Sequence, residues 1–345
     1  MGSKTNLIMK KAGAVLRSWQ LYVLLLPALI WLVIFAYYPI YGLLIAFKDY
    51  KGTMGIMGSL WVQPLFKHFT TFFSTSIAVN AIKNTVTISV LSLIVAFPIP
   101  IIFALLLNQV TRNGPRKFIQ TVSYAPYFLS TVVIVSIITV LFSANGLVNN
   151  IIRDLGGKEI MFTSVPEWFR PLYIGSSVWQ TMGFNAIIYI AALVGISPEY
   201  YEAAIIDGAT KFQRVIHIDI PNILPTIILM LILTVGNIMN VGYEKAYLMQ
   251  NNMNTTVSEL ISTYVYKVGL QSAQYSFATA VGLFNSMVNF VILILTNLLA
   301  KKTSDIIARV GSYSTWGGSM TINNLDVRHQ HVQKRDINPS RFCAI

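Results

Sequence analysis

The chain has few charged residues and almost no cysteine. Of its 345 residues only 11% are charged and 54% are hydrophobic, and the mean hydropathy is +0.61. Soluble domains carry about 25% charged residues, so the shortage of charge indicates a chain whose main solvent is lipid. The one cysteine, Cys343, excludes a disulfide within the chain and a cysteine metal cluster.

The sequence also lacks the motifs of catalysis and of nucleotide binding. It contains no G-x-x-x-x-G-K-[ST] phosphate loop and no H-E-x-x-H pair. The apolar stretches hold no Ser/His/Asp set and no carboxylate pair. Only His329 and His331 are close together, in a polar tail where histidines are more often solvated than metal-bound. We therefore predict no catalytic residue, no metal site and no cofactor bound by this chain. Any ATP-driven step needs another polypeptide.

The excess of basic residues gives a net charge of +12. These residues are scattered at the ends of apolar runs rather than gathered in one patch. A nucleic-acid partner is therefore not predicted.

Six apolar runs are long enough to cross a bilayer as helices. A span needs about 20 apolar residues, and in lipid the backbone must satisfy its own hydrogen bonds. We predict an all-α integral membrane protein with six transmembrane helices, at residues 21–47, 85–107, 124–142, 173–194, 227–249 and 277–299. The first run is too long for the core of a signal peptide and lacks a cleavage site, so it is expected to stay as an anchor.

The basic residues near the spans predict the orientation. The loop at 108–123 holds Arg112, Arg116 and Lys117 and no acidic residue, which places it in the cytoplasm by the positive-inside rule. Residues 1–20 are then a cytoplasmic N-terminal segment, residues 21–302 the six-span domain, and both termini are cytoplasmic. Residues 303–345 are polar, rich in Gly, Ser and Asn and without helical periodicity. They are predicted to be disordered.

The cytoplasmic loop between the fourth and fifth spans reads "YYEAAIIDGATKFQRVIHIDIP" (200–221). Ser197 and Pro198 suit the start of a short helix, and Asp207-Gly208 suits a turn. A second helix is expected to follow and to be stopped by Pro221 and Pro225. An amphipathic helix lying on the membrane is the simpler interpretation of such a loop.

The spacing within this loop is more specific than that. Glu202-Ala203-Ala204 is followed by Gly208 and then by Ile218-Asp219-Ile220-Pro221. This closely resembles the cytoplasmic loop of permease subunits of ATP-binding-cassette importers, with Ile220 where the family has leucine. "MNVGYEKAYLMQNN" and the sixth span look like the branch that imports oligosaccharides or polysaccharides, the maltose-type permeases and, closer, those for aldouronate or alginate. The resemblance covers most of residues 15–303.

The resemblance implies a permease subunit of a binding-protein-dependent importer in the bacterial plasma (inner) membrane. Its partners would be a second permease subunit forming a heterodimer, two ATPase subunits that bind ATP and Mg²⁺, an extracellular sugar-binding protein and the lipid bilayer. The loop would be the coupling helix that docks on an ATPase. The residues implied in ATPase coupling are Glu202, Ala203, Ala204, Asp207, Gly208, Arg214 and Pro221.

Polar residues inside spans are expensive and often functional. The substrate-path candidates are Trp179, Gln180 and Asn185 in the fourth span, Asn237, Asn240, Tyr243 and Glu244 in the fifth, and Asn285 and Asn289 in the sixth. For any single asparagine, hydrogen bonding between helices is the stronger interpretation. Glu244 and Lys245 are expected to form a local ion pair. Helix packing is expected to explain Gly183, Gly236 and Gly282.

Three alternatives remain open. A secondary transporter driven by an ion gradient would need ionisable residues in mid-span, where Glu244 is the only strong candidate. An enzyme acting within the membrane would need the catalytic groups that the spans lack. The third alternative is a permease of the same fold that imports another class of solute. Only the analogy of the fifth and sixth spans to sugar permeases argues against it.

Overall fold

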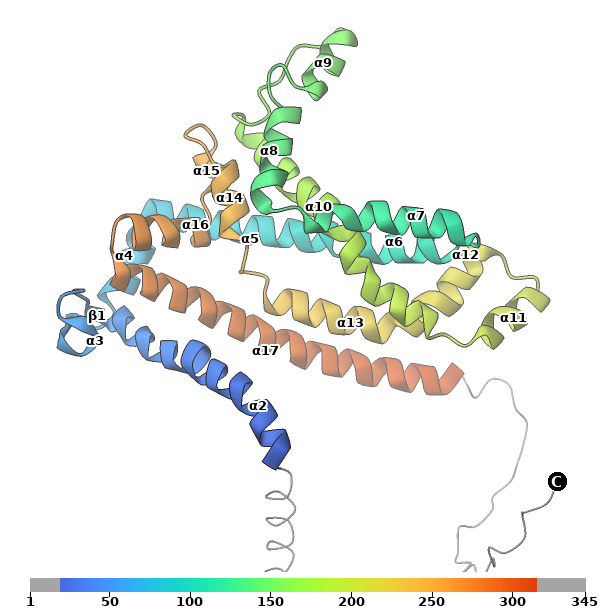
Figure 1. The fold of residues 1–345 in the computed structure, drawn as a ribbon, viewed down its shortest axis with the longest axis horizontal. Helices are drawn as coiled ribbons and strands as arrows, with labels where there is room; N and C mark the ends of the chain where they lie inside the picture. Colours follow the sequence, from blue (N-terminus) through green and yellow to red (C-terminus); the bar gives the residue numbers. More distant parts are fainter. Residues whose placement is uncertain (1–18, 315–345) are drawn as a thin grey trace, which may run out of the picture. The chain divides into compact units, whose positions relative to one another are not determined.

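The computed structural model describes residues 19–314. The chain divides into two units, residues 1–300 and 301–345, and the account below concerns the first, together with the end of α17 in the second. Figure 1 shows a fold built almost entirely of helices. Five helices in the described residues are long and apolar enough to cross a membrane, and a sixth span is formed if one bent pair is counted as a single element. The predicted all-α, six-span fold is confirmed.

The long elements carry the spans. They are α2 (Trp19–Leu32), continued by a π-helical turn (Val33–Tyr37) and a 3₁₀ segment (Tyr38–Phe47); α5 (Ser76–Ala96) with α6 (Pro98–Asn108); α7 (Asn113–Tyr124), a 3₁₀ turn (Ala125–Phe128) and α8 (Thr131–Leu141); α10 (Pro166–Val194); α13 (Ile220–Gly236); and α17 (Tyr275–Ser314).

Short elements connect the long ones. They are α3 (Gly55–Gly58), α4 (Lys67–Ser74), α9 (Leu147–Asp154), α11 (Pro198–Ile206), α12 (Lys211–Arg214), α14 (Tyr243–Met249), α15 (Thr255–Ser258), α16 (Ile261–Tyr266) and a π-helical turn (Lys267–Gln271). A two-stranded antiparallel ribbon joins β1 (Lys48–Asp49) to β2 (Leu60–Trp61), with Lys48 opposite Trp61.

Close backbone packing holds α10 against its neighbours. A Cβ at Gly183 of α10 would clash with the backbone oxygen of Ser123 in α7, and a Cβ at Gly236 of α13 would lie 2.6 Å from the side chain of Leu293 in α17. Only glycine allows the approach of α10 to the Ser123 backbone, so the predicted packing role of Gly183 is confirmed. At Gly236 the nearest atom is the flexible end of the Leu293 side chain, and its packing role stays a prediction. A Cβ at Gly282 would meet nothing within 4 Å, so no contact within the described part of the chain requires a glycine there.

The third span differs from its prediction at 124–142. The apolar helix α8 begins only at Thr131, where the Ser130 side chain caps it by accepting from the Val133 N–H. Before it, the segment that contains Pro126 is a 3₁₀ turn, and the two arms Asn113–Phe128 and Thr131–Leu141 are bent by 102°. Leu129 and Ser130, between the two arms, have extended backbone conformations, so the span is broken at this point.

The fifth span lies earlier in the chain than the predicted 227–249. A continuous helical stretch runs from Lys211 to Gly236 and ends where Asn237 bonds back to the Leu233 carbonyl. Glycine is a poor helix former and asparagine competes for backbone bonds. Tyr243 and Glu244 therefore lie outside the fifth span, in α14.

Pro221 does not stop the second loop helix, contrary to the prediction. It sits in the first turn of α13, and Pro225 lies inside that helix. A proline crowds the carbonyl four residues earlier, which for Pro221 belongs to His217. That residue lies in a π-helical turn (Val215–Asp219), where the α-helical bonding pattern is already changed.

The ends of the chain lie largely outside the described residues. α17 continues past the predicted boundary at 303 and reaches Ser314, so the first part of the predicted tail is helical. The rest of that tail, residues 315–345, and residues 1–18 of the predicted N-terminal segment are outside the described part of the chain.

Candidate functional site

The loop between α10 and α13 is a helical hairpin with a well-defined turn. At the end of α11 the Ala209 N–H bonds to the Ala204 carbonyl at 2.8 Å and the Gly208 N–H to the Ile205 carbonyl at 3.0 Å. This is a Schellman motif, which needs a left-handed residue at its centre, and Gly208 has φ +74°. The predicted turn at Asp207-Gly208 is confirmed.

The second helix of the hairpin has its own cap immediately after that turn. The Gln213 N–H donates to Thr210 Oγ1 at 3.3 Å, and the Thr210 N–H donates to Gln213 Oε1 at 2.8 Å. This reciprocal pair is a capping box. At the other end, Ser197 occupies the N-cap position of α11 but makes no capping bond with its side chain.

A buried carboxylate joins the hairpin to α6. Asp219 is fully buried and accepts from the Tyr201 hydroxyl at 2.5 Å and from Gln109 Nε2 at 3.1 Å. Burial, and then the hydrogen bond and charge of Asp219, raise the pKa of Tyr201 to about 12, so the phenol remains a donor at neutral pH. Sequence reasoning did not select Tyr201, Gln109 or Asp219; the signal available was a lone acid between Ile218 and Ile220.

The residues predicted for coupling lie on the outside of this hairpin. Glu202, Ala203, Asp207, Gly208 and Pro221 are exposed, and Ala204 and Arg214 are partly buried. A hollow of about 280 Å³ is lined by Ala204, Asp207, Gly208 and Arg214, among others. The hollow lies beside the turn, and its lining combines apolar groups with the polar side chains of Asp207, Gln213 and Arg214.

Large apolar side chains flank this hollow. Ile206 is 85% exposed and Phe212 is 72% exposed. Exposed apolar groups next to polar residues are typical of surfaces that contact another protein or a membrane. Arg214 adds an Nε that is buried and without a partner among the described residues.

Four predicted substrate-path asparagines meet between α13 and α17. The Asn240 side-chain oxygen accepts from Asn289 Nδ2 at 3.0 Å and from Asn285 Nδ2 at 3.3 Å, and Asn240 Nδ2 donates to Asn237 at 3.3 Å. The buried Asn289 also accepts from the Met239 N–H at 3.0 Å. We call these four residues the asparagine cluster. Its bonds hold the turn after α13 against α17.

A pocket of about 250 Å³ lies beside the asparagine cluster. Asn237 and Asn240 line it together with Tyr173 and Ser177 of α10 and with serines of α5. Hydroxyl, amide and aromatic groups therefore converge on one space, as they do in sites that recognise polar ligands.

The other substrate-path candidates are not part of that cluster. Trp179 borders an apolar hollow of about 360 Å³ between α8 and α10, Gln180 donates to the Leu129 carbonyl at 3.2 Å, and Asn185 is exposed. Tyr243 stacks on Tyr266 with ring centroids 5.2 Å apart, and Glu244 is exposed.

The predicted ion pair between Glu244 and Lys245 is wrong. Lys245 is buried and donates instead to Ser177 Oγ at 2.8 Å. The two residues are consecutive in α14, and consecutive helical side chains point in different directions.

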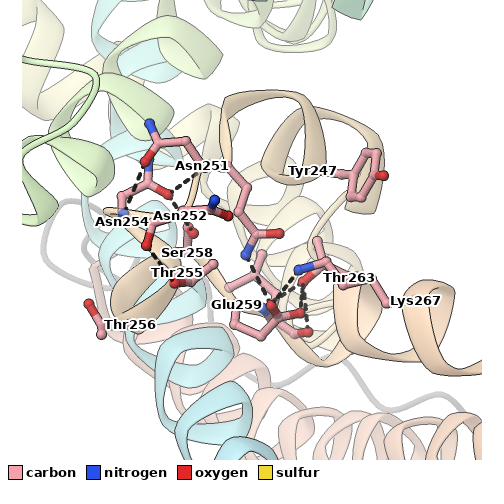
Figure 2. A network of polar contacts seen from close by, with 12 residues as sticks. Tyr247, Asn251, Asn252, Asn254, Thr255, Thr256, Ser258, Glu259, Thr263 and Lys267 are labelled. Atoms are coloured by element: carbon pink, nitrogen blue, oxygen red, sulfur yellow. Dashed lines mark hydrogen bonds and ion pairs between the residues drawn. The ribbon is translucent and has the colours of Figure 1, made fainter.

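A polar network that sequence reasoning missed fixes the segment between α14 and α16 (Figure 2). Glu259 accepts from Lys267 Nζ at 2.6 Å, from Thr263 Oγ1 at 2.9 Å and from Gln250 Nε2 at 3.1 Å. Asn84 of α5 donates to the Glu259 carbonyl at 3.2 Å. These bonds fasten the irregular segment to a transmembrane helix.

A broken span and a capped hairpin between the fourth and fifth spans characterise this membrane domain. The family model described as "Binding-protein-dependent transport system inner membrane component" matches residues 96–305. The chain belongs to this family. It is a multi-pass membrane transport permease and not an enzyme, as its sequence predicts.

Curated relatives match over most of their length. The chain is 43% identical over 291 residues to protein LplB of Bacillus subtilis (strain 168), covering 84% of this chain and 91% of that protein. It is 42% identical over 283 residues to YteP of the same organism, a polygalacturonan/rhamnogalacturonan transport system permease protein, covering 82% of this chain and 88% of YteP.

Solved structures match as well. A chain of a bacterial ABC transporter involved in import of the acidic polysaccharide alginate is 40% identical, with a TM-score of 0.79, covering 85% of this chain and 99% of that one. A chain of the bacterial alginate ABC transporter in complex with an alginate pentasaccharide-bound periplasmic protein is 41% identical, with a TM-score of 0.78, covering 84% and 97%. The sequence-based resemblance to carbohydrate permeases is thus confirmed.

Proposed function

We propose that this chain is the permease subunit of a binding-protein-dependent ABC importer for an oligosaccharide or polysaccharide. The observation that carries the proposal is its 40% identity and TM-score of 0.79, across 85% of the chain, to a chain of an alginate importer. The relative YteP belongs to a transport system for polygalacturonan and rhamnogalacturonan. A carbohydrate polymer is the substrate class that these proteins share.

The hairpin α11–α12 is the proposed contact with a separate ATPase subunit, which holds ATP and Mg²⁺. Its turn is fixed by two caps, its outer face exposes Ile206 and Phe212, and its hollow holds Asp207 and Arg214. Glu202 and Arg214 supply polar contacts. Close approach of the partner is allowed by the small residues Ala203, Ala204 and Gly208. Pro221 lies in the first turn of α13, the helix that transmits the movement into the membrane.

The hairpin and both termini are assigned to the cytoplasmic side of the bacterial plasma membrane. The basic loop that includes Arg112, Arg116 and Lys117 supports this orientation by the positive-inside rule. A second permease subunit completes the translocation path, two ATPase subunits supply energy, and a sugar-binding protein delivers substrate from outside.

The proposed substrate path includes the pocket beside the asparagine cluster. Its amides and hydroxyls suit the hydroxyl groups of a sugar, and Tyr173 offers a ring face. The further contacts proposed along the path, outside the asparagine cluster, are Trp179, Gln180, Asn185, Tyr243 and Glu244.

The test begins with the tagged chain in its native host. Mild solubilisation should co-purify a second permease and an ATPase, and proteoliposomes containing this complex and its binding protein should take up labelled oligosaccharide only with internal ATP. Uptake of an amino acid or a metal ion instead would favour another solute class. Uptake driven by an ion gradient by the chain alone would overturn the proposal in favour of a secondary transporter.

A further inference from the structure

Lys245 is a buried cation without a carboxylate. The residue is 7% exposed. Its ammonium group lies 2.8 Å from Ser177 Oγ and 5.3 Å from the centre of the Tyr173 ring. In the part of the chain that the structure describes, the only ion pair joins Lys267 to Glu259, and no acidic side chain lies within ion-pair distance of Lys245.

This arrangement is unfavourable unless another group completes it. An ammonium group has three donors, and one hydrogen bond of Lys245 to the described residues is present. An uncompensated buried charge is strongly destabilising. The ring face of Tyr173 offsets part of this by a cation–π contact. A methionine would fill the same space without the charge, so packing alone does not account for a lysine.

The position of Lys245 relates it to the substrate pocket. Both groups that it contacts, Ser177 and Tyr173, line the pocket of about 250 Å³ that Asn237 and Asn240 also line. Gly242, at the N-cap of α14, lines it too. Lys245 itself does not line the pocket, but its ammonium group lies directly behind the hydroxyl of Ser177 and the ring of Tyr173, which do.

We propose that Lys245 recognises the carboxylate of an acidic sugar unit and so selects a uronate-containing chain. The proposal rests on the function proposed above and narrows it from carbohydrates to acidic carbohydrates. A carboxylate supplies the missing opposite charge, and sugar hydroxyls pair with Ser177 and the amides of Asn237 and Asn240. The ammonium is a point charge with rotatable donors, which suits carboxylates presented in differing orientations along a polymer.

The test measures substrate preference in the assembled importer. Proteoliposomes with the complete complex take up labelled trigalacturonate or its fully methyl-esterified form, which has the same length and no charge. The readout is the ratio of half-saturating concentrations for the two probes, with binding protein at saturation and in its absence. The variants are Lys245→Met, Lys245→Arg and, as a matched control, Lys83→Met at an exposed lysine of α5.

Lys245→Met should reduce the preference for trigalacturonate at least tenfold, whereas Lys245→Arg should keep most of it and Lys83→Met all of it. An equal loss for both probes with Lys245→Met would assign a purely structural role and overturn the proposal. Wild-type uptake of the esterified probe with no preference for the acid would also overturn it, and would leave the proposed function intact. Wild-type uptake of neither probe nor any other oligosaccharide would instead refute the proposed function.

Discussion

Tyr201 donates a 2.5 Å hydrogen bond to Asp219 and so ties the first helix of the cytoplasmic hairpin to the root of the fifth span. Gln109, at the end of α6, bonds to the other carboxylate oxygen at 3.1 Å. Three segments distant in the sequence are thus held by one buried acid. The hairpin is fastened to the membrane domain at this point.

Removal of the Tyr201 hydroxyl should loosen that attachment. Tyr201→Phe deletes a hydrogen bond to a charged group, worth about 1.5–3 kcal/mol, and should lower the melting temperature of the solubilised complex and its uptake per ATP hydrolysed. Tyr200→Phe is the matched control, because Tyr200 is 59% exposed and makes no side-chain hydrogen bond among those described. Equal melting temperatures for the two variants would contradict the role of the bond.

The effect of Tyr201→Phe should not depend on pH in the ordinary range. The pKa of Tyr201 is raised from 10.0 to about 12 by burial and by Asp219. A group whose pKa is raised by folding stabilises the protein fully at pH values below its unfolded-state pKa. This stabilisation is lost as the pH rises through the folded-state pKa. The difference in melting temperature between wild type and variant should therefore be constant from about pH 6 to 9. A difference that vanishes within this range would point to another titrating group.

Two substitutions of Gly208 distinguish backbone strain at the hairpin turn from obstruction of the surface that docks the ATPase subunit. Gly208→Asn tolerates the left-handed conformation at +74°, and nothing within 4 Å blocks a Cβ. Gly208→Asn should leave assembly and much of the uptake intact. Gly208→Trp should stay in the membrane but uncouple ATP hydrolysis from uptake, because its ring occupies the space left for the partner. Normal uptake by the tryptophan variant would refute the docking role, and membrane content is measured alongside.

Two glycines provide a test of helix packing. Gly183→Ala places a methyl group against the backbone oxygen of Ser123, which cannot move without shifting α7. Overpacking of this kind destabilises by about 1–3 kcal/mol, so this variant should accumulate poorly and melt earlier. Gly282→Ala, where a Cβ meets nothing within 4 Å, should be neutral or slightly stabilising. Similar melting behaviour for both variants would show that α7 and α10 do not pack as described.

Single substitutions in the asparagine cluster should distinguish a residue that holds the fold from one that binds sugar. Asn289→Leu leaves the Met239 N–H without its partner, and an unsatisfied buried donor costs about 1–3 kcal/mol. This variant should lower the melting temperature of the complex. Asn237→Ala removes a pocket-lining amide with only local bonds and should raise the half-saturating sugar concentration at nearly unchanged melting temperature. The reverse pattern would exchange the structural and binding roles of the two residues.

The spans were predictable because a bilayer imposes a length and a polarity that a single sequence reveals. The hairpin turn was predictable for a local reason, since Gly208 fits the left-handed position after α11. The start and end of the fifth span were not predictable from the sequence. A π-helical turn lets the helix continue past Pro221, and Gly236 and Asn237 end the helix inside an apolar run.

Partners that are distant in sequence were beyond prediction from one chain. Asp219 accepts a hydrogen bond from Gln109, and Lys245 donates one to Ser177 rather than pairing with the adjacent Glu244. Such pairings depend on how α6, α10 and α14 pack, and no local pattern encodes that packing. The asparagines at 237, 240, 285 and 289 were chosen for their polarity in apolar surroundings; their meeting is a result of the fold.

The π-helical turn at Val215–Asp219 also sets the rotational phase between the hairpin and the fifth span. Such a turn holds one residue more than an α-helical turn, and one residue corresponds to about 100° of rotation about the axis. The extra residue therefore turns α12 by about that angle relative to α13, compared with a regular helix. The direction in which the hairpin faces is encoded by this one inserted residue, separately from the side chains on its surface.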